Sequence, residues 1–189
     1  MKKLCVLALS LLTLPALADN ERGFYIGAGV ASIDDLQDGI DNLSRIRAME
    51  LFGGYKYNAA LGVELRLGNG QTTGESKSYF DTNGQLQNGK LERDIGSYQS
   101  IYYKPELVND EAKLYALLGY THLNSSGKTF DGAGKLVSSS DDSASGYSYG
   151  LGVGFVINEH FNINIEYKNI CEEISRKPNL ASVNIDYRF

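Results

Sequence analysis

The stretch YSYGLGVGFVI, residues 147–157, alternates between two kinds of side chain. Odd positions carry large apolar or aromatic side chains, whereas the even positions hold one serine, one valine and three glycines. Successive side chains of a β-strand point to opposite faces, so the pattern predicts a strand with one apolar face and one nearly bare face. The glycines argue against a helix, because glycine destabilises helix interiors.

The same period of two recurs along the chain. It is clear in residues 61–67, 161–170 and 181–189, where apolar side chains alternate with polar or charged ones. Noisier versions occupy residues 24–33, 45–57, 98–107 and 112–123. With residues 147–157, these segments predict about eight strands of roughly ten residues each.

The connections between these segments alternate in length. Short turns are predicted at 58–59, 109–111 and 158–160, and long connections at about 34–44, 69–94, 124–145 and 171–179. Short turns at one end and long polar loops at the other are typical of a transmembrane barrel. We therefore predict an all-β, antiparallel, up-and-down transmembrane β-barrel of about eight strands. Folding of residues 69–94 into the wall would raise the number to ten.

Residues 1–18 have the organisation of a Sec export signal. Two lysines precede an apolar run that is too short to span a bilayer, and the segment ends in the small-x-small sequence ALA. Cleavage is predicted between Ala18 and Asp19, which makes residues 19–189 the barrel domain. Loss of Lys2 and Lys3 changes the formal charge from −5 to −7. An acidic exported protein is not expected to bind nucleic acid.

No cofactor or metal site is predicted. Cys171 is alone after cleavage, which leaves no intramolecular disulfide and no cysteine metal site, so we expect a free thiol near a loop, with intermolecular pairing as the alternative. Residues 80–86 (FDTNGQL) and 130–136 (FDGAGKL) have similar sequences. Both are predicted to be hairpin tips that extend strand pairs above the membrane. A calcium loop at Asp81 and Asn83 would need further carboxylates downstream, and these are missing.

Charged side chains fall on the inward face of the predicted strands by parity. Five acids and six bases are expected there: Glu50, Lys56, Glu64, Arg66, Lys104, Glu106, Lys113, Glu166, Lys168, Asp186 and Arg188. Charges removed from water need partners, so the near balance predicts a paired network. An eight-stranded barrel is only wide enough for side chains, which favours a filled lumen over a general porin. A gated proton or ion path is the alternative.

Aromatic side chains fall near the ends of the predicted strands. We expect two membrane-interface belts. The belt at the short-turn end would contain Tyr55, Tyr57, Tyr103, Phe155, Phe161 and Phe189, and the belt at the long-loop end Tyr98, Tyr120, Tyr147 and Tyr167.

Several features together resemble a known family. The closing sequence SVNIDYRF, with Tyr187 and the terminal Phe189, is similar to the signal by which the barrel-assembly machinery recognises its substrates. Residues 101–107 and 114–120 are similar to the fourth and fifth strands of such barrels. With the export signal and the loop pattern, the chain resembles the small eight-stranded Gram-negative outer-membrane barrels of the OmpA/OmpX-like, or porin, family. We expect no periplasmic peptidoglycan-binding domain after Phe189, which would be a departure from some of these barrels.

The resemblance implies an outer-membrane location and a set of partners. These are outer-membrane lipids and lipopolysaccharide, the barrel-assembly machinery and periplasmic chaperones during biogenesis, and a possible surface partner. We expect a non-enzymatic barrel whose exposed loops serve surface interaction or envelope integrity, with a small-solute or ion channel as the alternative. Some barrels resembling this one act on lipid A, and His122 is the candidate for such an enzyme, although Ser125 lies three residues away where two are expected. His160 is expected to be a solvated turn residue.

Overall fold

The computed structural model describes residues 22–36, 45–80, 84–108, 111–171 and 177–189. The predicted export signal, with Ala18 and Asp19, lies outside these ranges, as do Asp81 and Asn83. The strands are β1 (Gly23–Leu36), β2 (Ile46–Asn58), β3 (Leu61–Gly70), β4 (Gly74–Phe80), β5 (Leu86–Val108), β6 (Ala112–Asp131), β7 (Leu136–Val156), β8 (Phe161–Asn169) and β9 (Lys177–Arg188). Within the described ranges, no helix is long and apolar enough to cross a membrane.

Eight of the strands close into a barrel. All pairings are antiparallel, and the strands follow the order β3-β2-β1-β9-β8-β7-β6-β5. The ring is closed by β3 and β5, which pair from Leu61 opposite Pro105 to Asn69 opposite Ser97. The predicted all-β, up-and-down barrel is therefore confirmed.

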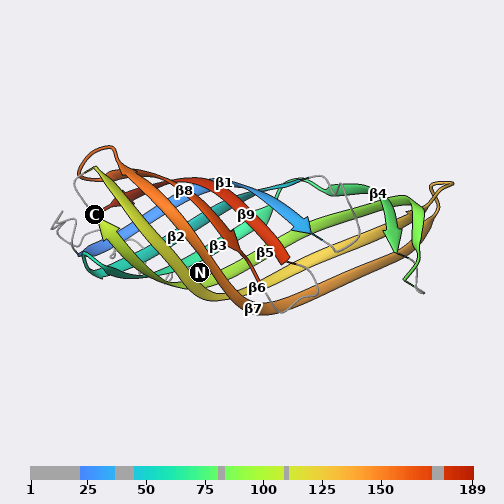
Figure 1. Cartoon of the computed structure of the whole chain (residues 1–189), viewed down its shortest axis with the longest axis horizontal. Helices are drawn as coiled ribbons and strands as arrows, with labels where there is room; N and C mark the ends of the chain where they lie inside the picture. Colours follow the sequence, from blue (N-terminus) through green and yellow to red (C-terminus); the bar gives the residue numbers. More distant parts are fainter. Residues whose placement is uncertain (1–21, 37–44, 81–83, 109–110, 172–176) are drawn as a thin grey trace, which may run out of the picture.

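Strand β4 lies beyond the barrel wall. It pairs with residues 86–93 of β5, whereas β3 pairs with residues 97–105 of the same strand. Strands β3 and β4 thus follow one another along one edge of β5, and the wall contains eight strands instead of ten. Figure 1 shows β4 and the far ends of β5, β6 and β7 projecting past the other strands.

This projecting part, which we call the raised sheet, consists of β4 with residues 86–95, 124–131 and 136–146. Most of the long connections predicted at 69–94 and 124–145 is paired strand, as expected of hairpins that extend strand pairs, and the ladder of β6 and β7 continues to Phe130 opposite Leu136. Residues 138–143 of β7 are exposed, so no buried face imposes the apolar period of two that reveals other strands.

The predicted hairpin tip at residues 130–136 is confirmed. Gly134 has a positive φ of 80°, a conformation that glycine adopts at no steric cost. The Asp131 carboxylate accepts hydrogen bonds from the backbone N–H groups of Ala133 and Lys135, each at 2.9 Å. A short aspartate-glycine turn therefore joins two strands that extend well beyond the wall.

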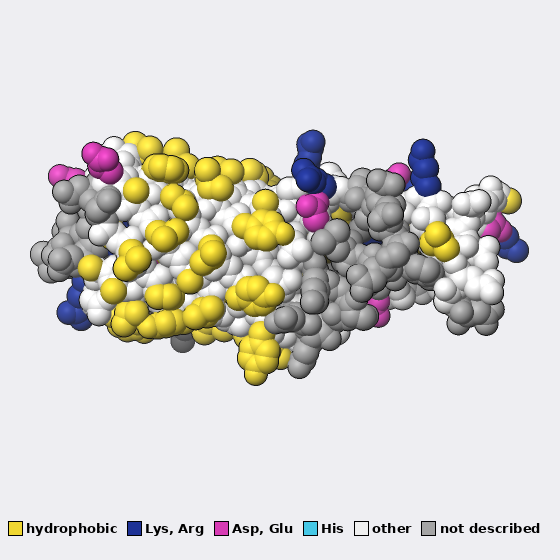
Figure 2. Space-filling view, in the orientation of Figure 1, with side chains coloured by type: hydrophobic (Ala, Val, Ile, Leu, Met, Phe, Trp, Pro, Cys, Tyr) yellow, Lys and Arg dark blue, Asp and Glu magenta, His cyan; other side chains and the backbone are white. Residues whose placement is uncertain are grey.

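The outside of the barrel is apolar. Leu51, Leu65 and Leu151 are each at least 60% exposed on this surface. Figure 2 shows hydrophobic side chains spread over the barrel body and few of them on the raised sheet, where charged side chains occur. An apolar outer band with a polar extension is the division expected of a membrane-spanning barrel.

Candidate functional site

The barrel interior is built from tyrosines that lie over glycines of a neighbouring strand. A Cβ atom added at Gly54 would come within 2.3 Å of the Tyr25 ring, and one at Gly152 within 2.3 Å of the Tyr115 ring. These glycines therefore make room for inward aromatic rings. The Tyr25 and Tyr115 hydroxyls in turn donate hydrogen bonds to buried carboxylates, those of Glu64 at 2.8 Å and Glu166 at 2.7 Å.

The carboxylates belong to a connected set of ion pairs at the centre of the lumen. The Arg66 guanidinium donates two hydrogen bonds to Glu166, at 2.5 and 2.8 Å, and a further one to Glu64. Lys168 contacts Glu50 at 2.7 Å. The planar guanidinium matches carboxylate geometry, which is why arginine suits such a buried position.

The set continues toward the short-turn end through Lys104. Its ammonium lies 3.2 Å from Glu64 and 3.4 Å from Glu106, and Lys56 contacts Glu106 at 2.8 Å. Four carboxylates and four cations are thus linked: Glu50, Glu64, Glu106, Glu166, Lys56, Lys104, Arg66 and Lys168. We call this set the central network. Its balanced charge meets the requirement that buried ions be paired.

The three remaining charges of the predicted lumen lie together beside β9. Lys113 contacts Asp186 at 3.1 Å, and Arg188 lies 3.9 Å from the same carboxylate. Amide groups of Asn162 and Asn164 donate to Asp186 at 2.8 and 2.6 Å. All eleven residues proposed from parity are buried, each at most 8% exposed.

An apolar layer lies on the other side of the central network, toward the raised sheet. It contains Ile33, Ile46, Ile95, Leu123, Ile170 and Leu180, each at most 5% exposed, with Tyr98 in the same cluster. The sequence analysis missed this layer. The sequence could have indicated this layer, because apolar side chains replace polar ones at the inward positions where the strands approach their long connections.

The aromatic residues proposed for the belts face outward with one exception. Tyr120, Tyr147 and Tyr167 are exposed at the end of the barrel near the raised sheet. Tyr98 was assigned to this outer group wrongly, because its side chain is 1% exposed and its ring lies over Gly68 inside the barrel. Its even position on β5, shared with the inward Lys104, is the physical reason.

The remaining aromatics proposed for the belts gather at the short-turn end. Tyr57, Tyr103, Phe155 and Phe161 are exposed. Tyr55 is half-buried and contacts Phe24 and Tyr57, with ring centroids 4.7 and 5.3 Å apart. Tyr187 and Phe189 of the proposed assembly signal are half-buried and contact each other edge-on at 5.2 Å.

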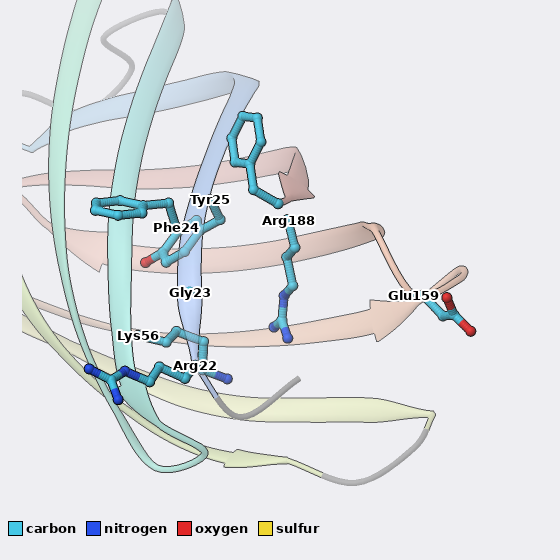
Figure 3. A pocket seen from close by; sticks show the side chains of 8 residues that line it. Arg22, Gly23, Phe24, Tyr25, Lys56, Glu159 and Arg188 are labelled. Carbon is cyan, nitrogen blue, oxygen red and sulfur yellow. The ribbon is translucent and has the colours of Figure 1, made fainter. Parts of the chain in front are cut away.

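The short-turn end of the barrel is narrow. A hollow of about 10 Å³, room for about one water molecule, is lined by side chains that include Arg22, Lys56 and Arg188. In Figure 3, Glu159 of the turn after β7 points away from these cations. The described side chains around this hollow therefore form a positive rim at the short-turn end.

The raised sheet carries charge of both signs. Lys90 contacts Glu92 at 2.7 Å and Glu75 at 2.9 Å on its surface, and hydrogen bonds to these carboxylates raise the pKa of Lys90. Two edges of the sheet have no neighbouring strand among the described residues. One is β4, and the other is residues 136–146 of β7, since β8 joins β7 only from Tyr149.

His122 lies on the outer surface near the base of the raised sheet. Its Nδ1 is 2.7 Å from the Ser145 hydroxyl on β7, the residue opposite it in the ladder. Among the described residues, none of the carboxylates hydrogen-bonds to His122, and no cluster of three or more His, Cys, Asp or Glu side chains has the arrangement of a metal site. Ser125 and Asp141 line a separate shallow cleft.

Known proteins share this architecture. The outer membrane protein beta-barrel domain matches residues 4–189. Ail, the attachment invasion locus protein of Yersinia pestis, is 22% identical with a TM-score of 0.60, over 89% of this chain and 99% of Ail. OprG from Pseudomonas aeruginosa is 16% identical with a TM-score of 0.58, over 92% of this chain and 99% of OprG.

A third solved structure, the N-terminal beta-barrel domain of Pseudomonas aeruginosa OprF, is 12% identical with a TM-score of 0.55, over 89% of this chain and all of that domain. No curated protein matches the chain. The three structural likenesses concern the fold alone, whereas the family match covers nearly the whole sequence. The chain therefore belongs to the outer membrane protein beta-barrel domain family and is an integral protein of the Gram-negative outer membrane.

Proposed function

We propose that the protein is a sealed, non-enzymatic barrel that holds a binding surface, the raised sheet, outside the cell. The observation that carries this proposal is a contrast within one molecule. The lumen is filled by a balanced network and an apolar layer, whereas residues 138–143 of the raised sheet are exposed and two of its edges have no neighbouring strand among the described residues. The interior stabilises the barrel, and the sheet makes the contacts.

Two properties of the interior support a sealed barrel. Ions crossing it would need to displace buried ion pairs, because the central network occupies the lumen between β2 and β8. They would then meet the apolar layer, and hydrophobic constrictions block conduction by excluding water. We expect purified protein in planar bilayers to show no discrete conductance steps.

A small-solute or ion channel predicts the opposite result. Steps that change in size with Glu64→Gln, a residue of the central network, would show that ions pass through the lumen and would overturn the sealed barrel. The Glu75→Gln variant on the raised sheet is the matched control, since its carboxylate lies outside the lumen. It should leave any conductance unchanged.

The proposed orientation of the barrel in the membrane is based on the difference between its short-turn end and the end that carries the raised sheet. Outward aromatic side chains at both ends of the barrel form the proposed interface belts, and the short turns face the periplasm. Residues 1–18 act as the export signal in this proposal. The mass of the protein isolated from outer membranes tests cleavage, since the mature chain should begin at Asp19.

The raised sheet suits recognition of an extended polypeptide segment. Residues 138–145 of β7, with sequence SSSDDSAS, contain neither the lysine nor the proline that commonly protects an edge strand. Small side chains leave the edge backbone accessible, and a partner strand adds to such an edge through main-chain hydrogen bonds.

Charge alone does not define the partner of the raised sheet. Ail has been crystallised with the heparin analogue sucrose octasulfate, a polyanion. The raised sheet here carries six acids and four bases among its described residues, and one further base, Lys135, lies in the turn at its tip. The ten are Glu75, Glu92, Asp94, Asp131, Asp141, Asp142, Lys77, Lys90, Arg93 and Lys128. This near balance provides no positive field for a polyanion and favours backbone recognition.

A shortened variant tests the role of the raised sheet. Replacement of residues 127–140 by Asn-Gly joins Ser126 to Asp141, which are opposite each other, through a two-residue turn. A fluorescent peptide of alternating Thr and Val with terminal lysines should bind the wild type and lose at least tenfold affinity for the shortened variant.

The control is the same peptide N-methylated at alternate residues, which removes its strand donors. Equal binding of both peptides, or equal binding to both proteins, would contradict strand addition. Retention of the heat-dependent mobility shift on SDS gels would show that the shortened barrel still folds. A second experiment compares the detergent resistance of cells that lack the protein after either the wild type or the shortened variant is supplied. If both proteins restore resistance, envelope integrity depends on the barrel and not on the raised sheet.

A further inference from the structure

The apolar outer surface of the barrel is hollowed on both sides of β1, near the short-turn end. One hollow, of about 730 Å³, lies over β2 and β3 and is bordered by Ile26, Tyr55 and Leu65. A second, of about 410 Å³, lies over β9 and is bordered by Ile26, Phe161 and Ile185. The two hollows share Ile26 of β1 with Leu51 and Phe52 of β2, so they are neighbours that meet along these residues.

Gly53 accounts for the depth of the larger hollow. In the sheet register it lies between Ile26 on β1 and Leu65 on β3, and its neighbours on the same face of β2 are Leu51 and Tyr55. A ring of large side chains therefore surrounds one position without a side chain. The absent side chain makes a pit in a surface that is otherwise covered by large apolar groups.

Packing within the protein does not require glycine at this position. A Cβ atom added at Gly53 would meet nothing closer than 3.8 Å, whereas one at the adjacent Gly54 would come within 2.3 Å of the Tyr25 ring. Gly54 is thus needed for the barrel interior and Gly53 is not. The smaller hollow has a similar origin, because the outward residue opposite Ile185 is Ala28.

A cation lies beside the larger hollow, next to one of its lining residues. Arg22 immediately precedes β1, is exposed, and donates a hydrogen bond from Nε to the Tyr55 hydroxyl at 2.9 Å. None of the described carboxylates forms an ion pair with it. Tyr55 lines the larger hollow and its ring contacts Phe24 at a tilt and Tyr57 edge-on; aromatic side chains of this kind are expected at the level of lipid headgroups.

We propose that these features form a binding site for one diacyl glycerophospholipid of negative net charge in the periplasmic leaflet. Arg22 binds the phosphate, and one acyl chain enters each hollow. Two hollows match two chains, and the guanidinium matches the phosphate, which accepts paired hydrogen bonds from arginine. Gly53 lies two residues from Tyr55, about 7 Å along the strand, at the depth of the upper acyl chain.

This inference rests on the membrane orientation proposed above, with the short turns in the periplasm. It differs from general contact with the bilayer in one respect. A site with fixed partners retains its lipid after the surrounding bilayer is removed, whereas annular lipid exchanges freely. Retention in detergent is therefore the property to measure.

Native mass spectrometry of the full barrel in detergent, with added phosphatidylglycerol or phosphatidylcholine, tests the site. We expect one phosphatidylglycerol to remain bound to the wild type. Arg22→Gln should reduce its occupancy at least fivefold and remove the preference over phosphatidylcholine. Gly53→Leu should reduce the occupancy of both lipids, because the new side chain fills the larger hollow.

Two control variants match these changes elsewhere. Arg47→Gln removes an exposed arginine at the other end of β2, and Ala116→Leu enlarges an outward residue on β6, away from both hollows. Both should retain the lipid. Equal occupancy in all five proteins, or no bound lipid in the wild type, would overturn the site, as would a dimer mass that shows this face to be a subunit interface.

The heat-dependent mobility shift separates this result from the proposed function. A variant that keeps the shift is a folded barrel, so a loss of lipid then reports on the site. A wild-type barrel that folds, does not conduct and binds the strand peptide, but retains no phosphatidylglycerol, would refute the lipid site alone. Conductance, by contrast, would refute the sealed barrel and leave the lipid result unaffected.

Discussion

Arg66 and Glu166 lie 100 positions apart in the chain and meet in the lumen through two parallel hydrogen bonds, of 2.5 and 2.8 Å. Arg66 is on β3 and Glu166 on β8, strands that are not neighbours in the wall. The contact therefore crosses the barrel and joins opposite sides of the ring. The Arg66 guanidinium also lies 4.8 Å from the centre of the Phe52 ring, which adds a cation–π contact.

Removal of Arg66 should be strongly destabilising. Arg66→Met leaves Glu64 and Glu166 buried without their main partner, and breaking a buried ion pair in this way typically costs about 3–5 kcal/mol. The free energy of unfolding in urea, measured by circular dichroism in lipid vesicles, tests this. The chain contains no tryptophan, so indole fluorescence offers no signal.

Two further variants show whether the loss comes from unpaired charge. Addition of Glu166→Gln to Arg66→Met should recover part of the stability, because one buried carboxylate is removed. Arg45→Met breaks an exposed pair with Asp34 and should cost at most about 1 kcal/mol. Equal effects of Arg45→Met and Arg66→Met would contradict the importance of the central network.

Two adjacent glycines should respond differently to the same substitution. Gly54→Val places a side chain in the space of the Tyr25 ring and should abolish the heat-dependent mobility shift. Gly53→Val adds a side chain to the outer hollow, where no atom lies within 3.8 Å of the new Cβ, and should leave the shift intact. SDS gels of outer-membrane fractions compare the two directly; a folded Gly54→Val barrel would refute the packing argument.

The apolar layer should contribute more to stability than the outer surface. Ile33 on β1 and Leu180 on β9 are opposite each other and fully buried, so alanine at either position should leave a cavity and cost about 2–5 kcal/mol. Val30 and Val183 are opposite each other on the same two strands but face outward. Alanine there should cost less in urea unfolding, because lipid chains fill the space. Equal losses would contradict the buried layer.

The proposed orientation can be tested with single cysteines. Ser139→Cys on the raised sheet should react with a membrane-impermeant maleimide on intact cells, whereas Glu159→Cys in a short turn should react only after the outer membrane is opened. Cys171 is fully buried and should stay unreactive until the barrel is unfolded. Labelling of Glu159→Cys on intact cells would reverse the orientation.

Much of the barrel was predictable from local pattern. Period-two alternation in residues such as 147–157 arises because one face of a wall strand meets lipid and the other meets the lumen. The same parity placed all eleven lumen charges, including Glu64 and Arg66, on the buried face. If the parity rule had been applied to every residue, it would also have placed Tyr98 inside the barrel, because Tyr98 and Lys104 are both at even positions of β5.

Pattern failed where both faces of a strand meet water. Residues 138–145 carry serine and aspartate at positions of either parity, so their pairing with β6 has no trace in hydrophobicity. The ladder that holds them in a strand consists of backbone hydrogen bonds, which every residue except proline can supply in full. The raised sheet was therefore invisible to periodicity, although the turn chemistry of its tip at Asp131 was not.

The sequence by itself determined the strand segments, the faces of their side chains and the membrane character of the barrel, because each depends on neighbours along one strand. Only the tertiary structure decided which charges pair across the lumen, that β4 leaves the wall, and that Arg22 hydrogen-bonds to Tyr55 beside the hollow that contains Gly53. These features depend on closure of the ring, which sets the register between strands, and no local pattern encodes the position of a residue relative to the far side of a barrel.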